Sequence, residues 1–327
     1  MANYSNDVLQ LFPSSFSAAV NVGAVTSMSH NLNNEVIAPE SGDPFAEQQV
    51  LIGQQPVLDV TTESIAAVLG QVGLTGLCIA PDTGKPGLTG FLQKHDPCSS
   101  DARAATNHQS ITFPNGHLVL GTLSSSRNSV ASLSMSAHFK ATDANPIPGI
   151  SNSASLPTSP ASVVEQFGQG KPTILGTVIH QVESVSVSFN PQLVKSNDSD
   201  TIYPTDIDPQ FFGVQTQIIA RSPELLGAGI PVGGQHTDGD SALRYIRRVT
   251  DESQVATASN GAFVDFTASQ HLLGQLNGLV MVGQHYDASG RSTGLTQIDV
   301  YGRQAGSAPI VWDLTNPYDL TTVTPAA

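Results

Sequence analysis

The clearest alternation of hydrophobic and polar positions lies in residues 182–189, which read Val-Glu-Ser-Val-Ser-Val-Ser-Phe. Val185, Val187 and Phe189 fall on one side of an extended chain, while the three serines of the segment fall on the other. Successive side chains of a strand point to opposite faces, so this period of two predicts a half-buried antiparallel strand. We therefore expect a sheet with one apolar face and one neutral polar face at this point.

Similar segments recur along the chain. Residues 130–139 alternate Leu133, Met135 and Ala137 with serines, as a second half-buried strand would. Turn-forming Gly, Pro, Asn and Asp separate further short apolar runs. Additional strands are expected at residues 50–60 with a break at Pro56, and at residues 74–80, 88–92, 111–113, 117–123, 174–180, 211–220, 243–249, 262–266, 279–285 and 295–301.

Two local signals refine this pattern. The dipeptide Asn115-Gly116 stands between two expected strands, and Asn-Gly supplies the positive-φ residues of a tight hairpin, so a β-hairpin is predicted there. Residues 63–69 predict a short helix that Thr62 caps and Gly70 ends. The second signal is the strongest indication of a helix in the chain.

Strands clearly outnumber helices, which predicts an all-β fold, mainly an antiparallel β-sandwich or barrel, with one or two short helices and long loops. Residues 1–48 contain many Asn and Pro, and we expect an extended N-terminal arm that packs on a neighbour. Residues 49–327 are expected to form the β-sandwich or barrel assembly domain, with the loop at 143–170 as a candidate divide between two halves. Residues 190–209 predict a polar, acidic loop.

Composition and charge narrow the function. Only 12% of the 327 residues are charged, the formal net charge is −14, and there are five lysines. A low lysine content is typical of subunits whose surface is buried in interfaces with other subunits. A low lysine content of the source genome as a whole would give the same composition. The negative charge argues against a protein that grips nucleic acid through phosphates. The tight basic cluster of Arg244, Arg247 and Arg248 favours ion pairs or an interface.

Cys78 and Cys98 flank a loop rich in Pro and Gly, and a hairpin there would bring them close enough to bridge. Two cysteines do not make a disulfide framework, and we favour a pair of free thiols. The first residues have neither a basic nor an apolar signal region, and no apolar run is long enough to span a bilayer. We therefore expect a soluble protein without a membrane partner.

Motifs for chemistry are weak. Gly239-Asp240-Ser241 matches the nucleophile motif of one lipase and esterase family, but the Asp-x-x-His pair that should follow near the C-terminus is missing. Residues 236–240 and the acidic loop at 198–208 offer ligands for a cation without the spacing of an EF-hand. Isolated histidines are expected to be ordinary hydrogen-bonded residues; these are His180, His271 and His285. We therefore predict no enzyme activity, no catalytic residue, no metal site and no cofactor, with a cation in the acidic loop as the open alternative.

Residues 176–220 resemble a known family. The approach to the strand at 182–189, the polar loop after it, Ile202-Tyr203-Pro204-Thr205, and a strand that ends in Gln217-Ile218-Ile219-Ala220 are similar to virion structural proteins of tailed bacteriophages, particularly tail tube proteins. Residues 62–74, 243–247 and 279–282 continue the resemblance loosely. It covers about half of the chain and rests on pattern; the N-terminal arm and the 143–170 loop lie outside it.

The resemblance implies a β-sandwich or barrel whose subunits join their sheets into rings, and rings that stack into a tube. It also implies a location in the virion after assembly in the host cytoplasm, with copies of the chain and other virion proteins as partners. DNA would be only a passing cargo, and an acidic lumen would keep it from condensing on the wall.

Two other functions stay open at this point. Another virion component, such as a capsid, decoration or sheath-like protein, would share the same assembly character. A β-sandwich adhesin or appendage that binds glycans is the alternative from a different functional class. Trp312 is the only tryptophan, so the chain has few aromatic side chains on which a sugar ring could stack. A hydrolase built on Ser241 is the least favoured hypothesis.

Overall fold

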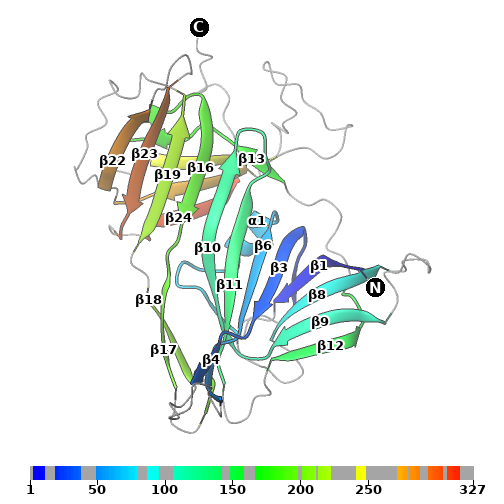
Figure 1. Cartoon of the computed structure of the whole chain (residues 1–327). Coiled ribbons are helices and arrows are strands. Elements are labelled where there is room, and N and C mark those ends of the chain that lie inside the picture. Colours follow the sequence, from blue (N-terminus) through cyan, green and yellow to red (C-terminus); the bar gives the residue numbers. More distant parts are fainter. Residues whose placement is uncertain are drawn as a thin grey trace.

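Twenty-four strands and one short helix build the described part of the protein, which is a computed structural model (Figure 1). The described residues are 3–11, 19–37, 49–79, 87–95, 106–141, 148–157, 166–197, 201–210, 213–221, 241–247, 271–278, 280–287, 294–304 and 308–316. All strand pairs in the sheets are antiparallel, which confirms the predicted all-β fold with long loops.

The largest sheet has nine strands in the order β22-β23-β19-β16-β10-β11-β6-β3, and β7 pairs with one end of β10. The strand predicted most clearly, β16, lies near its middle between β10 and β19. The strands are β3 (Val25–Asn31), β6 (Val57–Thr62), β7 (Leu77–Ile79), β10 (Gly116–Ser126), β11 (Ser132–Phe139), β16 (Val182–Ser188), β19 (Val214–Ala220), β22 (Val280–Asp287) and β23 (Leu295–Gly302).

Two smaller sheets and two ribbons complete the fold. The five-stranded sheet contains β1 (Asn3–Leu11), β2 (Val20–Val22), β8 (Leu88–His95), β9 (His108–Phe113) and β12 (Gly149–Ala154). The six-stranded sheet contains β13 (Phe167–Gln169), β14 (Thr173–Ile174), β15 (Thr177–Val178), β20 (Ser241–Arg247), β21 (His271–Leu276) and β24 (Ile310–Asn316). The ribbons are β4 (Asn34–Ile37) with β5 (Val50–Gln54), and β17 (Gln192–Ser196) with β18 (Asp206–Gln210).

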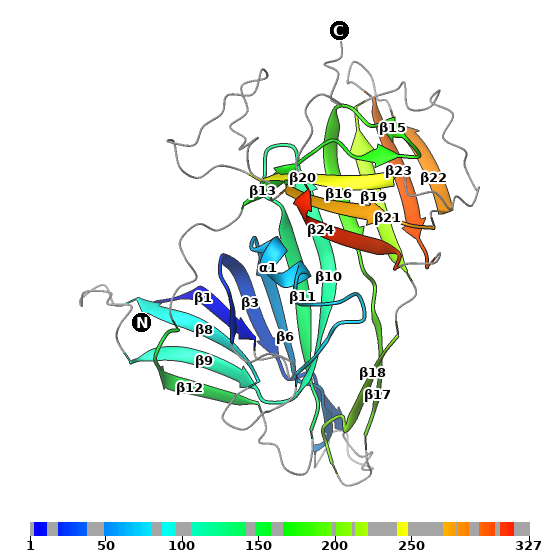
Figure 2. The same cartoon turned by 180° about the vertical axis from the view of Figure 1, so that it is seen from behind.

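Both smaller sheets pack on the same face of the nine-stranded sheet, here called its inner face, so two sandwiches share one long layer (Figure 2). In the first, Phe113 of β9 meets Phe139 of β11 edge to face, with ring centroids 6.3 Å apart. In the second, Tyr245 of β20 and Ser125 of β10 are both buried, and burial raises the pKa of the tyrosine. The buried apolar residues of both sandwiches form one continuous core.

The alternation of β11 and β16 is as predicted. Val185, Val187 and Phe189 are buried, while the serines of β16 lie on the opposite, outer face of the sheet. Leu133 and Met135 of β11 are buried in the same way. Burial of about 1.5–3 kcal/mol per large apolar side chain fixes this register, because a slip by one residue would expose all of them.

The predicted helix is present as α1 (Ile65–Leu69), which is separated from β6 by two residues and is followed by Gly70. Thr62 still belongs to β6, so Ser64 takes the cap position instead. The Thr62 hydroxyl accepts a hydrogen bond from the Ser64 N–H at 3.0 Å and donates one to the Gly23 carbonyl at 2.7 Å. The Thr62 side chain therefore holds the backbone of Ser64, the residue before the helix, and does not cap the helix itself.

The hairpin predicted at Asn115-Gly116 is wrong. The strands on either side, β9 and β10, join different sheets and do not pair with each other. Gly116 has φ +153°, and a Cβ there would lie 2.0 Å from the His138 carbonyl oxygen. The glycine is needed because β11 approaches closely where the chain turns the corner between two sheets.

Three segments expected to lack regular structure contain strands. The residues expected to form an N-terminal arm supply β1, β2, β3 and β4, and Leu9 and Leu11 of β1 are buried in the core. The expected loop at 143–170 contains β12 and β13, and the expected polar loop at 190–209 contains the β17–β18 ribbon. Short polar strands at edges and in ribbons lack the apolar alternation that would reveal them. The strand expected at 262–266 lies outside the described residues.

Candidate assembly surface

Ser241, the candidate nucleophile, is fully buried in β20. Its hydroxyl oxygen accepts a hydrogen bond from the Leu175 N–H at 2.8 Å, which ties β20 to the turn after β14. Gly239 and Asp240 lie outside the described residues. A nucleophilic serine needs access to substrate and a base within hydrogen-bond reach, so the observed contact is structural and does not support a hydrolase.

The candidate cation ligands are not brought together. Asp206 of the acidic loop lies in β18 and forms an ion pair of 2.7 Å with Lys140, whose hydrogen bond and charge lower the pKa of the carboxyl group. Asp198 and Asp200 lie outside the described residues, as do residues 236–240. Within the described ranges, no three His, Cys, Asp or Glu side chains form a group that could hold a metal ion.

The remaining candidates have local roles or lie outside the described part. His271 is buried, and its Nδ1 accepts a hydrogen bond from the Arg247 N–H at 3.0 Å, which joins β21 to β20. Cys78 is exposed and is a free thiol; Cys98 is outside the described residues. Arg248 and the side chain of His285 also lie outside them.

The outer face of the nine-stranded sheet is a broad, neutral polar surface. One cross-strand row runs over five neighbouring strands and consists of small hydroxyl and amide side chains that end at a carboxylate. In this row the two serine hydroxyls of β11 and β10 lie 3.2 Å apart, and the glutamine donates to the carboxylate at 3.1 Å. The row comprises Ser132, Ser124, Ser186, Gln217 and Asp299.

The charges on this face are mostly compensated. Glu183 of β16 lies between Arg127 and Arg221, with N–O distances of 3.2 and 2.8 Å. Asp299 accepts hydrogen bonds from the amides of Gln217 and Gln297. Charged partners this exposed add little stability, but they leave the face without a cluster of free cations among the described residues.

Both edges of the nine-stranded sheet are unpaired in the part of the chain that the structure describes: no described strand pairs with the outer side of β3 or of β22, and β1 lies next to β3 without pairing with it (Figure 1). Natural edges are usually protected by lysine, proline or a strong bulge. Residues 25–31 carry no charged residue and no proline, and residues 280–287 carry one acid, at the end of the strand. These edges are therefore suited to pairing with another strand.

The β4–β5 ribbon carries an exposed apolar surface that the sequence patterns did not single out. Its large hydrophobic side chains are 38–50% exposed, and every residue of β4 is exposed, so neither face of that strand is packed. An isolated two-stranded ribbon is marginally stable in water. The exposed apolar residues are Val36, Ile37, Val50, Leu51 and Ile52, with Leu32 just before the ribbon. The run of apolar residues at 50–52 correctly predicts a strand, but it does not show that the strand is exposed.

No model of a known protein family matches the chain, and no curated protein matches it. Among the described residues, no helix is both long and apolar enough to cross a membrane. The geometry of the sheet, its edges and the exposed ribbon is therefore the basis for a functional proposal.

Proposed function

We propose that this chain is a self-assembling structural subunit of a virion, of the tail tube type, and that copies of it join through the edges of the nine-stranded sheet. The observation that carries the proposal is the pair of unprotected edges, β3 and β22, on opposite sides of one broad sheet. A strand edge presents unpaired N–H and C=O groups, and each edge can pair with the other edge of a neighbouring copy.

Edge pairing of this kind is heterologous, because two different strands of the same chain meet. Heterologous contacts between identical subunits close into rings when the rotation between neighbours allows it. The right-handed twist of antiparallel sheets supplies such a rotation between successive copies. A closed ring of sheets would leave no open edge, which is how barrels avoid aggregation.

The outer face of the sheet fits the wall of a passage. Its serine and glutamine side chains and its paired charges offer no cluster of free Lys and Arg among the described residues. Tight binding to DNA requires several cationic contacts to phosphates. A neutral or acidic wall therefore lets a polyanion pass without retaining it, in agreement with the net charge of −14.

The β4–β5 ribbon supports a second contact, between stacked rings. It lies beside the β17–β18 ribbon at one end of the molecule, at the bottom of Figure 1. The nine residues of the ribbon include a single charged residue, Glu35. Burying such a ribbon against a second copy would remove apolar area from water, which is the main favourable term in association.

Electron microscopy of two double variants tests the proposal. Ser27→Lys/Ser29→Lys places two charges on exposed positions of β3, and Ser151→Lys/Ser153→Lys places the same charges on exposed positions of β12, the open edge of the five-stranded sheet. We expect rings or tubes from the natural protein and the β12 variant. The β3 variant should stay monomeric, because lysines on an edge oppose strand pairing.

The folded state of both variants is checked first, since exposed substitutions should change the free energy of unfolding by at most about 0.5 kcal/mol. A natural protein that stays monomeric at high concentration contradicts self-assembly. Closed shells or flat arrays in place of rings contradict the tube and favour a capsid or decoration role. Rings from the β3 variant contradict the edge joint.

A further inference from the structure

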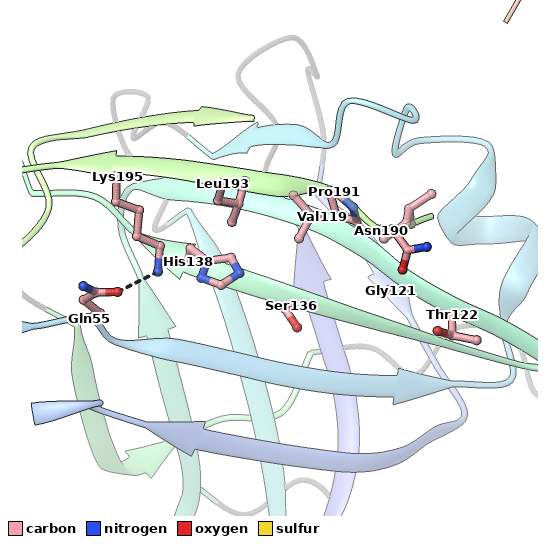
Figure 3. Close-up of a pocket in the computed structure, with 11 residues that line it drawn as sticks. Gln55, Val119, Gly121, Thr122, Ser136, His138, Asn190, Pro191, Leu193 and Lys195 are labelled. Carbon is pink, nitrogen blue, oxygen red and sulfur yellow. Dashed lines mark hydrogen bonds between the residues drawn. The ribbon is translucent and has the colours of Figure 1, made fainter. Parts of the chain in front are cut away.

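The β17–β18 ribbon, here called the arch, runs beside β10 and borders a space that opens along the outer face of β10 and β11 (Figure 3). This space has a volume of about 670 Å³, within the size range of small-molecule sites. Leu193 and Lys195 of β17 point from the ribbon toward the sheet, where His138 of β11 lies near Lys195 (Figure 3). Val119 and Ser136 also line the space. Val194, between Leu193 and Lys195, is 51% exposed on the other side of the ribbon.

The arch is fastened to the body at several points. The Gln54 N–H donates to the Ile202 carbonyl at 2.7 Å, and the Ala141 N–H donates to the Pro204 carbonyl at 2.8 Å. Tyr203 packs edge to face on Phe139 with ring centroids 5.4 Å apart. The Lys140–Asp206 ion pair adds a further link. These contacts attach the ribbon to the body of the protein, so the space beside it is formed without a ligand.

One end of the space is cationic. Lys195 Nζ donates a hydrogen bond to the amide oxygen of Gln55 at 3.1 Å, and no described carboxylate lies within 4.0 Å of it. His138 Nδ1 is buried beside it and has no hydrogen-bond partner among the described residues. Asp59, the nearest acid on the floor, accepts a hydrogen bond from Ser136. Among the described residues, the half-buried ammonium group therefore has one neutral amide as its hydrogen-bond partner, which favours an anion next to it.

The middle of the space is apolar, whereas Thr122 and Asn190 line the end opposite Lys195 (Figure 3). Val119, Pro191 and Leu193 line the middle of the space, and a bulge in β10 forms its far wall. The bulge is held by the Ser134 hydroxyl, which accepts a hydrogen bond from the Thr122 N–H at 2.8 Å. A ligand that fits the cationic end and the apolar middle carries one negative group and a short aliphatic part.

We propose that the arch is a binding site for a small aliphatic monocarboxylate, with the carboxylate between Lys195 Nζ and His138 and the aliphatic chain along Val119 and Leu193. The carboxylate accepts a charge-assisted hydrogen bond from Lys195 and a second hydrogen bond from the imidazole N–H. The aliphatic chain covers apolar surface that water now contacts. The site is independent of the proposed assembly, because it is built within a single chain.

The titration of His138 provides a signal that a purely structural arch would not give. Burial first, and then the positive charge of Lys195, lower the pKa of His138 to about 4, with a small contribution from His117; Asp59 acts in the opposite direction. A carboxylate bound beside the ring would stabilise the imidazolium form. Bound ligand should therefore raise the pKa of His138.

Nuclear magnetic resonance of the histidine rings in the full chain tests the site, with the His138 signal assigned through its loss in His138→Gln. Sodium butyrate is the probe, and butyramide, which has the same aliphatic part without the charge, is the matched control. We expect saturable shifts of the His138 signal, a higher His138 pKa with butyrate, and binding of butyramide at least about tenfold weaker.

Lys195→Gln should weaken butyrate about tenfold and leave butyramide unchanged, while Lys171→Gln, a lysine away from the arch, should change neither. Natural-abundance spectra that keep the β17 signals in place would verify that the Lys195 variant retains the arch. Equal binding of the two probes overturns the proposal, as does unchanged butyrate affinity in Lys195→Gln. The absence of a saturable shift at about 100 mM butyrate, far above the range of specific sites, does so too.

Discussion

The two faces of the nine-stranded sheet follow the same alternation but serve different purposes. On the inner face, Val185, Val187 and Phe189 are buried under the six-stranded sheet and its neighbours. On the outer face, the serines of the same strand are only partly covered and stand in polar cross-strand rows. Stability is therefore concentrated on one face, and the other is free to meet solvent, a second copy or a ligand.

The outer face of the sheet itself has two parts with different surroundings. No described segment covers it over β16, β19 and β23, whereas next to β10 and β11 the β17–β18 ribbon borders it and creates an amphipathic space. The alternation alone cannot distinguish these two parts, because both have small polar side chains. The difference arises from a ribbon that returns to the sheet.

The largest effect is expected on the inner face. Phe189→Ala removes a fully buried ring at the end of β16 and should lower the free energy of unfolding by about 3–5 kcal/mol, through lost burial and the cavity left behind. Ser188→Ala, the adjacent residue on the outer face, is the control and should change it by at most about 0.5 kcal/mol. Chemical denaturation measures both, and similar effects of the two changes would contradict the division between the faces.

Next in size is a pH effect within the arch. Because the pKa of His138 is about 4 in the folded chain and its ordinary value is 6.5, the unfolded chain binds the proton more readily. The free energy of unfolding should fall as the pH drops from about 6.5 to about 4, by up to about 3 kcal/mol, and this contribution should change no further below pH 4.

Denaturation at several pH values checks this effect, with His138→Gln as the variant that lacks the titrating group. The slope between pH 6.5 and 4 should be smaller in that variant. Lys195→Gln should also reduce it, because loss of the neighbouring positive charge raises the pKa of His138. An unchanged slope in His138→Gln would assign the acid sensitivity to other groups.

The smallest effect on stability is expected on the open part of the outer face. Ser186→Lys, in the middle of the polar row, should change the free energy of unfolding by at most about 0.5 kcal/mol. If the face lines a passage, the variant still assembles and gains salt-sensitive DNA retention, since each subunit now offers a cation to phosphates. Loss of assembly would instead indicate that this face lies between subunits, and would contradict the proposal that it lines the passage.

Local sequence patterns predict much of the fold, but they predict little about the candidate surfaces. Alternation at β11 and β16 correctly predicted both strands and their buried sides, and Pro56 correctly separated β5 from β6. Strand β4 escaped notice because all of its residues are exposed, and β17 and β18 because their residues are mostly polar and acidic and were assigned to a loop. Lys195 drew attention only as one of few lysines, since its position over His138 depends on residues more than fifty positions apart in the chain.

The sequence by itself determined the all-β class, the short helix and the side of each strong strand that would be buried, because these depend on neighbours within a few residues. Only the tertiary structure decided which strands pair. The turn at Asn115-Gly116 illustrates the reason: it could close a hairpin, but the close approach of β11 to Gly116 sends β10 into a different sheet from β9. Open edges, an uncovered ribbon and the arch are consequences of such long-range pairing, and a side-chain pattern with a period of two does not encode the partner of a strand.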